Sequence, residues 1–236
     1  MSALYLKSQR KLFDIRDRLV QKDIRITEAD LKPKESFLME RVITASVAIE
    51  GSMNENDGFS DVTPSDLRAT QYRPQLNAVS VDIETDCHAS TLYSIGIYSD
   101  DVSIVFMVGP TEDSIQQTDD GGNLELYQLN SEREVIRAFV KKILDLDPDV
   151  IMGWNIVNFD LRRLQDFCDR LKMPLLLGRN NEAISWRKAR DSNDRYYALL
   201  PGRAVLDGIE LMRSATYQFE NFSLEYVARQ LLDRGK

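Results

Sequence analysis

The spacing of hydrophobic and polar residues divides the chain into two parts near residue 75. In the first part, apolar residues recur every three to four positions in two short segments, which is typical of amphipathic helices. A short strand-like segment follows and gives way to a stretch rich in turn-forming residues. We expect a helix through Leu12, Ile15 and Leu19, a helix over 36–43, a strand over 46–51, and a loop or edge segment over 51–74.

The second part begins with three short segments of alternating or continuous apolar residues joined by turns. Short connections between consecutive strands favour antiparallel neighbours. Amphipathic helices then alternate with apolar strands, and such crossovers make parallel neighbours. We expect strands over 78–85, 91–99, 102–108, 150–153 and 203–208, helices over 131–149, through Leu161 to Leu171 and over 223–232, a loop over 111–123, and a hairpin made by 184–188 and 196–200.

The longest predicted helix has clear signals at both ends. Ser131 and Glu134 form a capping box, in which a hydroxyl and a carboxylate three residues later bind the exposed N–H groups of the first turn. Pro148 marks the other end. Three antiparallel strands, then parallel strands with helices packed on them, predict an α/β fold with a mixed sheet over 76–236, next to part of a smaller α+β domain over 1–75.

Two acidic residues interrupt the first strand of the predicted sheet. Side chains alternate along a strand, so Val79, Val81 and Ile83 share one face. Asp82 and Glu84 share the opposite face, roughly 7 Å apart. At that distance and an effective dielectric near 20, like charges repel by about 2 kcal/mol. A strand that carries this repulsion indicates that something offsets it.

Charge is distributed unevenly along the chain. The net charge of −8 over 236 residues does not favour a nucleic-acid partner by itself. Residues 77–160 contain 16 acidic and 4 basic side chains, however, and 161–203 contain 10 basic and 5 acidic ones. This order fits a cation site beside a phosphate-binding surface, and a mixed solvated surface would give the same totals. With no apolar run near 20 residues and no signal-peptide pattern, we expect a cytoplasmic protein with no membrane partner.

Polar residues also follow the strand over 150–153. Asn155 lies in the turn after it, and Asp160 lies at the start of the next helix. Ligands of such sheets bind beyond the carboxyl ends of the parallel strands, so Asp160 would face Asp82 and Glu84 if the two strands are neighbours. Three converging carboxylates without His or Cys favour Mg²⁺ or Mn²⁺. Two such ions can activate a water for phosphodiester hydrolysis.

The segments VDIET and GWNIVNFD, which contain these acids, resemble the first and second exonuclease motifs of family B DNA polymerases. The resemblance extends over nearly the whole chain from about residue 9, through FLMERVITASVAIEG, GRAVLDGIE and SLEYVARQLL, and bacterial members are the most similar. It implies a ribonuclease H-like 3'-5' exonuclease domain over 76–236 and part of the polymerase N-terminal domain over 1–75. The parent enzyme would be a DNA-directed DNA polymerase.

The resemblance also implies roles for individual residues. The catalytic residues, which would bind two Mg²⁺ or Mn²⁺ ions, are Asp82, Glu84 and Asp160. The residues that would hold the single-stranded 3' end of DNA are Thr85, Asn155 and Phe159, with the ring of Phe159 against the terminal sugar or base. The product would be a 5'-dNMP. Further partners would be the remaining polymerase domains and, through them, a sliding clamp.

The third exonuclease motif of the family is absent from this sequence. That motif places an Asp four residues after a Tyr on a helix, whereas Tyr217 is followed by Asn221 and Tyr226 by Gln230. We therefore expect an exonuclease domain truncated before its third motif, with little or no nuclease activity of its own. The alternative is a non-catalytic DNA-binding or scaffolding module that keeps the same fold.

Other residues have an ordinary structural interpretation beside a functional one. Asp207, at the end of a predicted strand, is interpreted as a structural acid near the cluster. Trp186 and Tyr196 could stack on DNA, although packing within the hairpin is the expected role. Several basic residues could contact phosphates or serve as surface charges: Arg162, Arg163, Arg187, Lys188 and Arg190.

Overall fold

The structure, a computed structural model, describes residues 4–56, 59–110, 112–117, 123–189, 195–233 and 235. Its internal contacts divide the chain into two compact units, Met1–Gln75 and Leu76–Lys236. None of the described helices is both long enough and apolar enough to cross a lipid bilayer.

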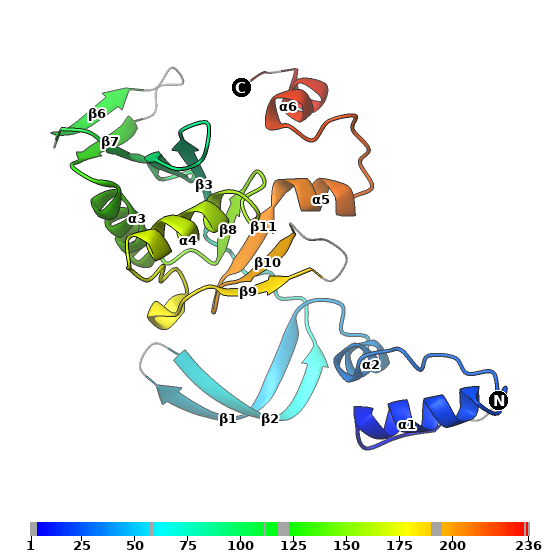
Figure 1. Cartoon of the computed structure of the whole chain (residues 1–236). Coiled ribbons are helices and arrows are strands. Elements are labelled where there is room, and N and C mark those ends of the chain that lie inside the picture. The colour runs from blue at the N-terminus through cyan, green and yellow to red at the C-terminus, as the bar shows by residue number, and fades with distance from the viewer. Residues whose placement is uncertain are drawn as a thin grey trace. The chain divides into compact units, whose positions relative to one another are not determined.

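The first unit consists of two helices and a two-stranded hairpin, drawn from blue to cyan in Figure 1. Ile43 is the one buried hydrophobic residue among those described in this unit, so the unit has little core of its own. The strands pair antiparallel along their whole length. The elements are α1 (Gln9–Val20), α2 (Pro33–Glu40), β1 (Val47–Asn56) and β2 (Phe59–Ala69).

Two segments, one interpreted as a loop or edge segment and the other as a loop, contain strands. Most of 51–74 belongs to β1 and β2. At the ends of 111–123, β6 (Glu112–Gln117) pairs antiparallel with β7 (Asn123–Leu129), while 118–122 lie outside the described residues. These segments lack the alternation of apolar and polar residues that predicts a strand. Nearly all of β1 is exposed to solvent, and β6 is the edge strand of its sheet.

The second unit is built on a seven-stranded mixed sheet in the order β11-β8-β3-β4-β5-β7-β6. β3, β4 and β5 are antiparallel neighbours, and β8 pairs parallel with both β3 and β11. The predicted α/β fold, with antiparallel strands followed by parallel ones, is confirmed. The strands of this central part are β3 (Ala78–Thr85), β4 (Leu92–Tyr98), β5 (Ser103–Val108), β8 (Val150–Gly153) and β11 (Ala204–Asp207).

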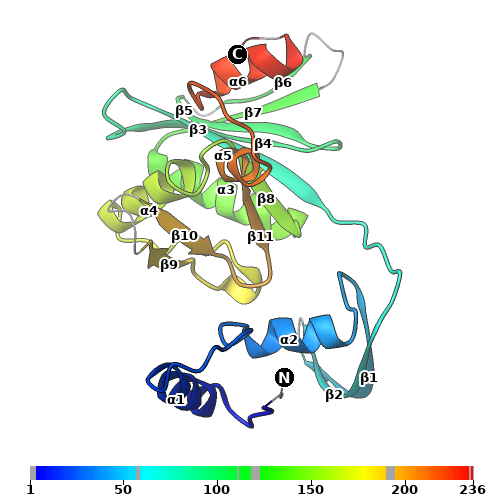
Figure 2. The same cartoon turned by 90° about the vertical axis from the view of Figure 1, so that its right-hand side faces the viewer.

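Helices α3 (Glu132–Leu146) and α4 (Asp160–Arg170) cover one face of the sheet (Figure 2). The Ser131 half of the predicted capping box is present, because the Ser131 hydroxyl accepts a hydrogen bond from the Glu134 N–H at 3.4 Å. The Glu134 carboxylate accepts from the Asn130 N–H at 3.0 Å. The two helices and the sheet share one hydrophobic core. Its fully buried members include Ile95, Ile97, Ile136, Phe139, Ile143, Leu161 and Leu164.

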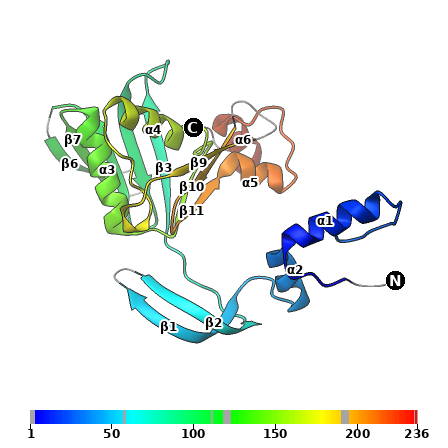
Figure 3. The same ribbon diagram turned by 60° about the horizontal axis from the view of Figure 1, so that its bottom comes forward.

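The C-terminal elements lie around the edge of the sheet that is formed by β11. The predicted hairpin is formed by β9 (Ser185–Lys188) and β10 (Tyr196–Leu199), and it lies beside β11 (Figure 3). Helix α5 (Gly208–Ser214) follows β11 directly and was not predicted, because seven residues are too few to show a helical period. Helix α6 (Leu224–Leu232) lies on the side of the sheet opposite to α3 and α4 (Figure 2).

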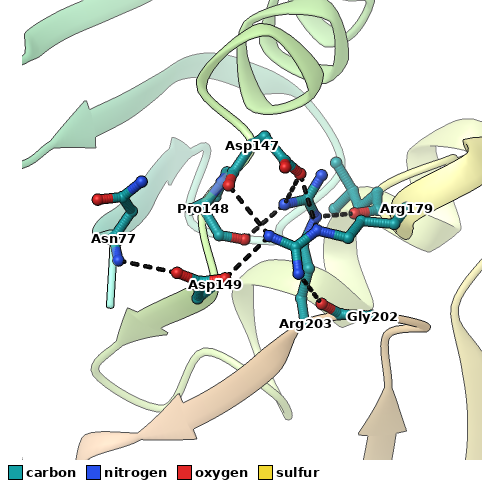
Figure 4. A network of polar contacts seen from close by, with 8 residues as sticks. Asn77, Asp147, Pro148, Asp149, Arg179, Gly202 and Arg203 are labelled. Carbon is teal, nitrogen blue, oxygen red and sulfur yellow. Dashed lines mark hydrogen bonds and ion pairs between the residues drawn. The ribbon is translucent and has the colours of Figure 1, made fainter. Parts of the chain in front are cut away.

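A network of arginines and aspartates joins the amino ends of the three parallel strands (Figure 4). Arg203 is buried just before β11; it donates to two backbone carbonyls and lies 2.8 Å from the Asp147 carboxylate. Arg179 bonds to Asp147 and Asp149 at 2.9 Å each, and Asp149 accepts from the Asn77 N–H just before β3. The network fixes where the strands begin, and therefore where their carboxyl ends meet.

Candidate active site

The acids of the first motif lie where β3 extends past the end of β8. β3 pairs with β8 only as far as Ser80, which lies opposite Met152. The apolar side chains of β3 are buried in the core, whereas Asp82 and Glu84 are exposed. The alternation expected from the sequence is therefore observed, and both carboxylates belong to the face turned away from the core.

The turn after β8 passes very close to β3. A Cβ at Gly153 would lie 2.6 Å from the carbonyl oxygen of Val81, so any side chain larger than hydrogen would force the two segments apart. Asn155 then has a φ of 59°, a left-handed conformation that Asn adopts more readily than most residues. This tight turn brings the start of α4 to the edge of β3.

Asp160, the first residue of α4, is almost completely buried, with 1% of its surface exposed. Its Oδ1 accepts a hydrogen bond from the Ile83 N–H at 3.0 Å, beyond the last residue of β3 that pairs with β8. Burial, together with the negative charges of Asp82 and Asp207, raises the pKa of the Asp160 carboxyl to about 7. The structure therefore brings Asp160 close to Asp82, although they are far apart in the chain.

Asp207 fixes the turn that leads to Asp160. Its Oδ2 accepts a hydrogen bond from the Val157 N–H at 3.1 Å. Its Oδ1 caps α5 by accepting from the N–H groups of Ile209 and Glu210 at 3.0 and 3.4 Å. With 6% of its surface exposed, Asp207 joins the end of β11, the start of α5 and the turn, which agrees with its interpretation as a structural acid.

Two further side chains anchor the same turn, and sequence analysis did not single them out. The Asn158 Oδ1 accepts a hydrogen bond from the Tyr196 N–H on β10 at 2.8 Å. The Trp154 Nε1 donates to the carbonyl oxygen of Phe222, between α5 and α6, at 2.9 Å. The sequence feature that could have identified them is an aromatic residue and an amide in a turn directly after a strand. A rigid sheet often positions functional loop residues at such places.

The residues expected to hold DNA lie at the ends of the elements that carry the acids. Thr85 ends β3, and its hydroxyl donates to the Asp86 carbonyl at 3.1 Å. The Asn155 carbonyl accepts from the Phe159 N–H at 2.9 Å. Phe159 precedes α4 and leaves 37% of its surface exposed, so its ring is available to a ligand rather than enclosed in the core.

The carboxylate oxygens of Asp160 and Asp82 are the kind of ligand that a hard divalent cation prefers. A buried carboxyl with a raised pKa beside a second carboxylate is stabilised in its ionised form when a cation binds. Within the described ranges, however, no group of three or more His, Cys, Asp or Glu side chains surrounds one point closely enough to hold an ion. The assignment of Asp82, Glu84 and Asp160 as a complete ligand set therefore stays a prediction.

The β9–β10 hairpin packs on α4 through aromatic rings. Trp186 and Tyr196 meet edge to face with centroids 6.5 Å apart. The Arg162 guanidinium lies 5.4 and 4.7 Å from these two rings. The rings therefore pack within the hairpin as expected, and Arg162 is part of that packing. Arg190 lies outside the described residues.

Comparisons with known proteins agree on one family. Residues 24–227 match the family model described as "DNA polymerase family B, exonuclease domain". DNA polymerase II of Escherichia coli K12 is 39% identical over 99% of this chain and 29% of its own length. The DNA polymerase delta catalytic subunit of Schizosaccharomyces pombe is 30% identical over 48% of the chain and 11% of its own length. A DNA polymerase of Thermococcus aggregans is 27% identical over 80% of the chain and 11% of its own length. The chain thus spans less than a third of each relative.

Proposed function

Because the chain belongs to the family B DNA polymerases and contains their exonuclease domain, we propose that it is the proofreading part of a DNA-directed DNA polymerase similar to DNA polymerase II. The domain would remove mispaired nucleotides from a single-stranded 3' end as 5'-dNMPs. The observation that carries this proposal is the hydrogen bond from the Ile83 N–H to Asp160, which joins the two motifs at one sheet edge. The division into 1–75 and 76–236 as polymerase domains is part of the same proposal.

The three carboxylates are the proposed ligands of two divalent ions, Mg²⁺ or Mn²⁺. Bound ions would supply an activated water and would stabilise the leaving oxygen of the phosphodiester. The protein contributes position and charge: Asp82 and Glu84 stand exposed on β3, and Asp160 is held by the Ile83 N–H. Asp160, whose pKa is raised to about 7, would give up its proton when a cation binds.

The DNA end would be held by residues next to these carboxylates. The hydroxyl of Thr85 and the amide of Asn155 suit the polar sugar and phosphate groups of a 3' nucleotide. The partly exposed ring of Phe159 suits a base or sugar face, and stacking of this kind accepts any base, as proofreading requires.

The rest of the polymerase is a further part of the proposal. We expect this chain alone to bind Mg²⁺ weakly and to digest DNA slowly or not at all, because its sequence has no third exonuclease motif. The remaining polymerase domains would supply that motif and the site of DNA synthesis, and they would connect the enzyme to a sliding clamp. We expect the enzyme to act in the cytoplasm.

The decisive experiment uses the longer polymerase that contains this chain. We expect Asp82→Ala to reduce digestion of single-stranded DNA by about 100-fold or more and to leave primer extension at the wild-type rate. Asp100→Ala, at an exposed acid outside β3, is the matched control and should retain both activities. If Asp82→Ala digests DNA normally, Asp82 is not part of the site. If none of the three acids matters, a non-catalytic DNA-binding or scaffolding module becomes the better description.

A further inference from the structure

Three aromatic rings follow one another in the segment between α5 and α6. The rings of Tyr217 and Phe219 stack with centroids 5.8 Å apart and planes within 6° of parallel. Phe219 meets Phe222 edge to face at 5.5 Å. The Arg213 guanidinium lies 4.8 Å from the centroid of Phe222. We refer to Tyr217, Phe219 and Phe222 as the aromatic strip.

The aromatic strip lies at the surface and not in the core. Tyr217 leaves 47% of its surface exposed, Phe219 and Phe222 are half-buried, and none of the three belongs to the hydrophobic core of the second unit. Among the ring pairs of the described residues, Tyr217 has one partner, Phe219. Apolar rings grouped on an exposed segment are characteristic of binding surfaces, because their exposure to water is unfavourable.

Trp154 ties the aromatic strip to the candidate active site. Its indole Nε1 donates to the carbonyl oxygen of Phe222 at 2.9 Å. The same indole lies against the start of α5, where a Cβ at Gly208 would be 2.7 Å from the Trp154 ring. Trp154 immediately precedes Asn155, so the strip is fixed to the turn that leads to Asp160.

We propose that the aromatic strip binds the bases of single-stranded DNA a few nucleotides from its 3' end, with Arg213 paired to a phosphate. This inference rests on the proposed function, because the 3' end is taken to lie at Asp160. Tyr217 and Phe219 stack on each other, so the face of Tyr217 that is turned away from Phe219 is the ring face offered to a base. Stacking on aromatic rings tolerates every base, which a proofreading enzyme needs on an unpaired strand.

Arg213 provides the charge that complements the DNA backbone. Its side chain is 55% exposed, and its Nη1 lies 3.3 Å from Glu210 Oε1. A guanidinium has five N–H donors arranged as a fork, so donors remain for a phosphate oxygen after this ion pair forms. An aromatic strip with an exposed guanidinium at one end matches the alternation of bases and phosphates along a strand.

The test is the affinity of this 236-residue chain for a labelled oligothymidylate of about 12 nucleotides, measured by fluorescence anisotropy with EDTA present to prevent hydrolysis. We expect the double variant Tyr217→Ala, Phe219→Ala to bind about tenfold more weakly, since each lost stacking contact weakens binding by a few-fold or more. Tyr217→Phe with Phe219→Tyr keeps both rings and should bind like the wild type. Tyr72→Ala, at a tyrosine that is 67% exposed in the first unit, is the matched control and should also bind normally.

Abasic sites locate the contact on the DNA. Abasic sites two to four nucleotides from the 3' end should weaken wild-type binding and remove the difference between wild type and the double alanine variant. Equal affinity of wild type and the double variant, or no binding by the wild type, would overturn the inference. An Asp82→Ala polymerase that still digests DNA would overturn the proposed function instead, and DNA binding by the strip could still be demonstrated in EDTA.

Discussion

The backbone N–H of Ile83 donates a hydrogen bond to the carboxylate of Asp160 at 3.0 Å, across 77 positions of the chain. The bond joins the strand of the first motif to the helix start of the second at the point where β3 no longer pairs with β8. Even with backbone hydrogen bonds from the N–H groups of Ile83 and Asp160 itself, the buried carboxylate is poorly compensated for the loss of water. Its pKa of about 7 expresses that cost.

The first prediction concerns the pH dependence of stability. The Asp160 carboxyl has a pKa of about 7 in the folded chain and roughly 3.9 when unfolded. Between these values the folded state binds the extra proton, so stability should fall as the pH rises from about 4 to about 7. Asp160→Asn cannot ionise and keeps an oxygen for the Ile83 N–H. At pH 8 in EDTA it should be more stable than wild type by about 4 kcal/mol, measured by urea denaturation.

The same comparison at pH 4 serves as its control. The wild-type carboxyl is then protonated in the folded state, so the advantage of Asp160→Asn should disappear. An equal gain at pH 4 and pH 8 would show that the amide improves packing or hydrogen bonding and that ionisation of Asp160 is not the cause.

The second prediction concerns divalent cations. If Asp82 and Asp160 bind Mg²⁺ or Mn²⁺ with a dissociation constant of about 1 mM, about 10 mM of the ion should stabilise the chain by about 1.4 kcal/mol. Asp82→Asn and Asp160→Asn should each lose this stabilisation, whereas Asp100→Asn should retain it. The measurement is the thermal unfolding midpoint with and without the ion. Equal ion-induced shifts in all four proteins would exclude these carboxylates as ligands.

The sequence predicts the central strands, and which of them are antiparallel or parallel, because these strands are buried. Val79, Val81 and Ile83 alternate with polar residues because one face of β3 packs on α4 and into the shared hydrophobic core. The described side chains of β2 are nearly all exposed, so β2 lacks that constraint and its sequence has the pattern of a loop or edge segment. Helix α5 was missed for another reason, since its start depends on the Asp207 cap and its length is too short for a period to appear.

The candidate site likewise combines residues that the sequence reveals with contacts that it does not reveal. Asp82, Glu84 and Asp160 are recognisable because charged residues at strand ends stand out against an apolar background. The contacts that position them are backbone contacts between distant segments, such as Val157 N–H with Asp207. Any sequence with an acid after a strand would look similar, so spacing alone does not reveal which N–H that acid binds.

The third prediction concerns the glycine that ends β8. In Gly153→Ala the added methyl group would lie 2.6 Å from the Val81 carbonyl oxygen, a backbone atom that cannot move without shifting β3. We expect a loss of about 2 kcal/mol of stability or more. The displaced turn should also weaken Mn²⁺ binding at Asp160, measured by titration calorimetry. Gly96→Ala is the control, because the nearest neighbour of its Cβ is a carbonyl oxygen at 3.8 Å. A Gly153→Ala chain of wild-type stability and Mn²⁺ affinity would contradict the close approach.

The last prediction concerns the network at the opposite end of the parallel strands. Arg203→Met leaves the carbonyls of Pro148 and Leu177 without their buried guanidinium donor and the Asp147 carboxylate with Arg179 as its remaining charged partner. We expect a loss of about 3 kcal/mol in urea denaturation at neutral pH. Lys141→Met removes a cation from an exposed ion pair with Asp145 on α3 and should cost about 0.5 kcal/mol or less.

Hydrogen bonding to Arg179 and Arg203 holds the pKa of Asp147 below its usual value. This carboxylate therefore stabilises the fold at neutral pH and loses that effect as the pH falls through the carboxyl range. The penalty of Arg203→Met should therefore shrink in acid, and an unchanged penalty at low pH would assign it to the two carbonyls alone.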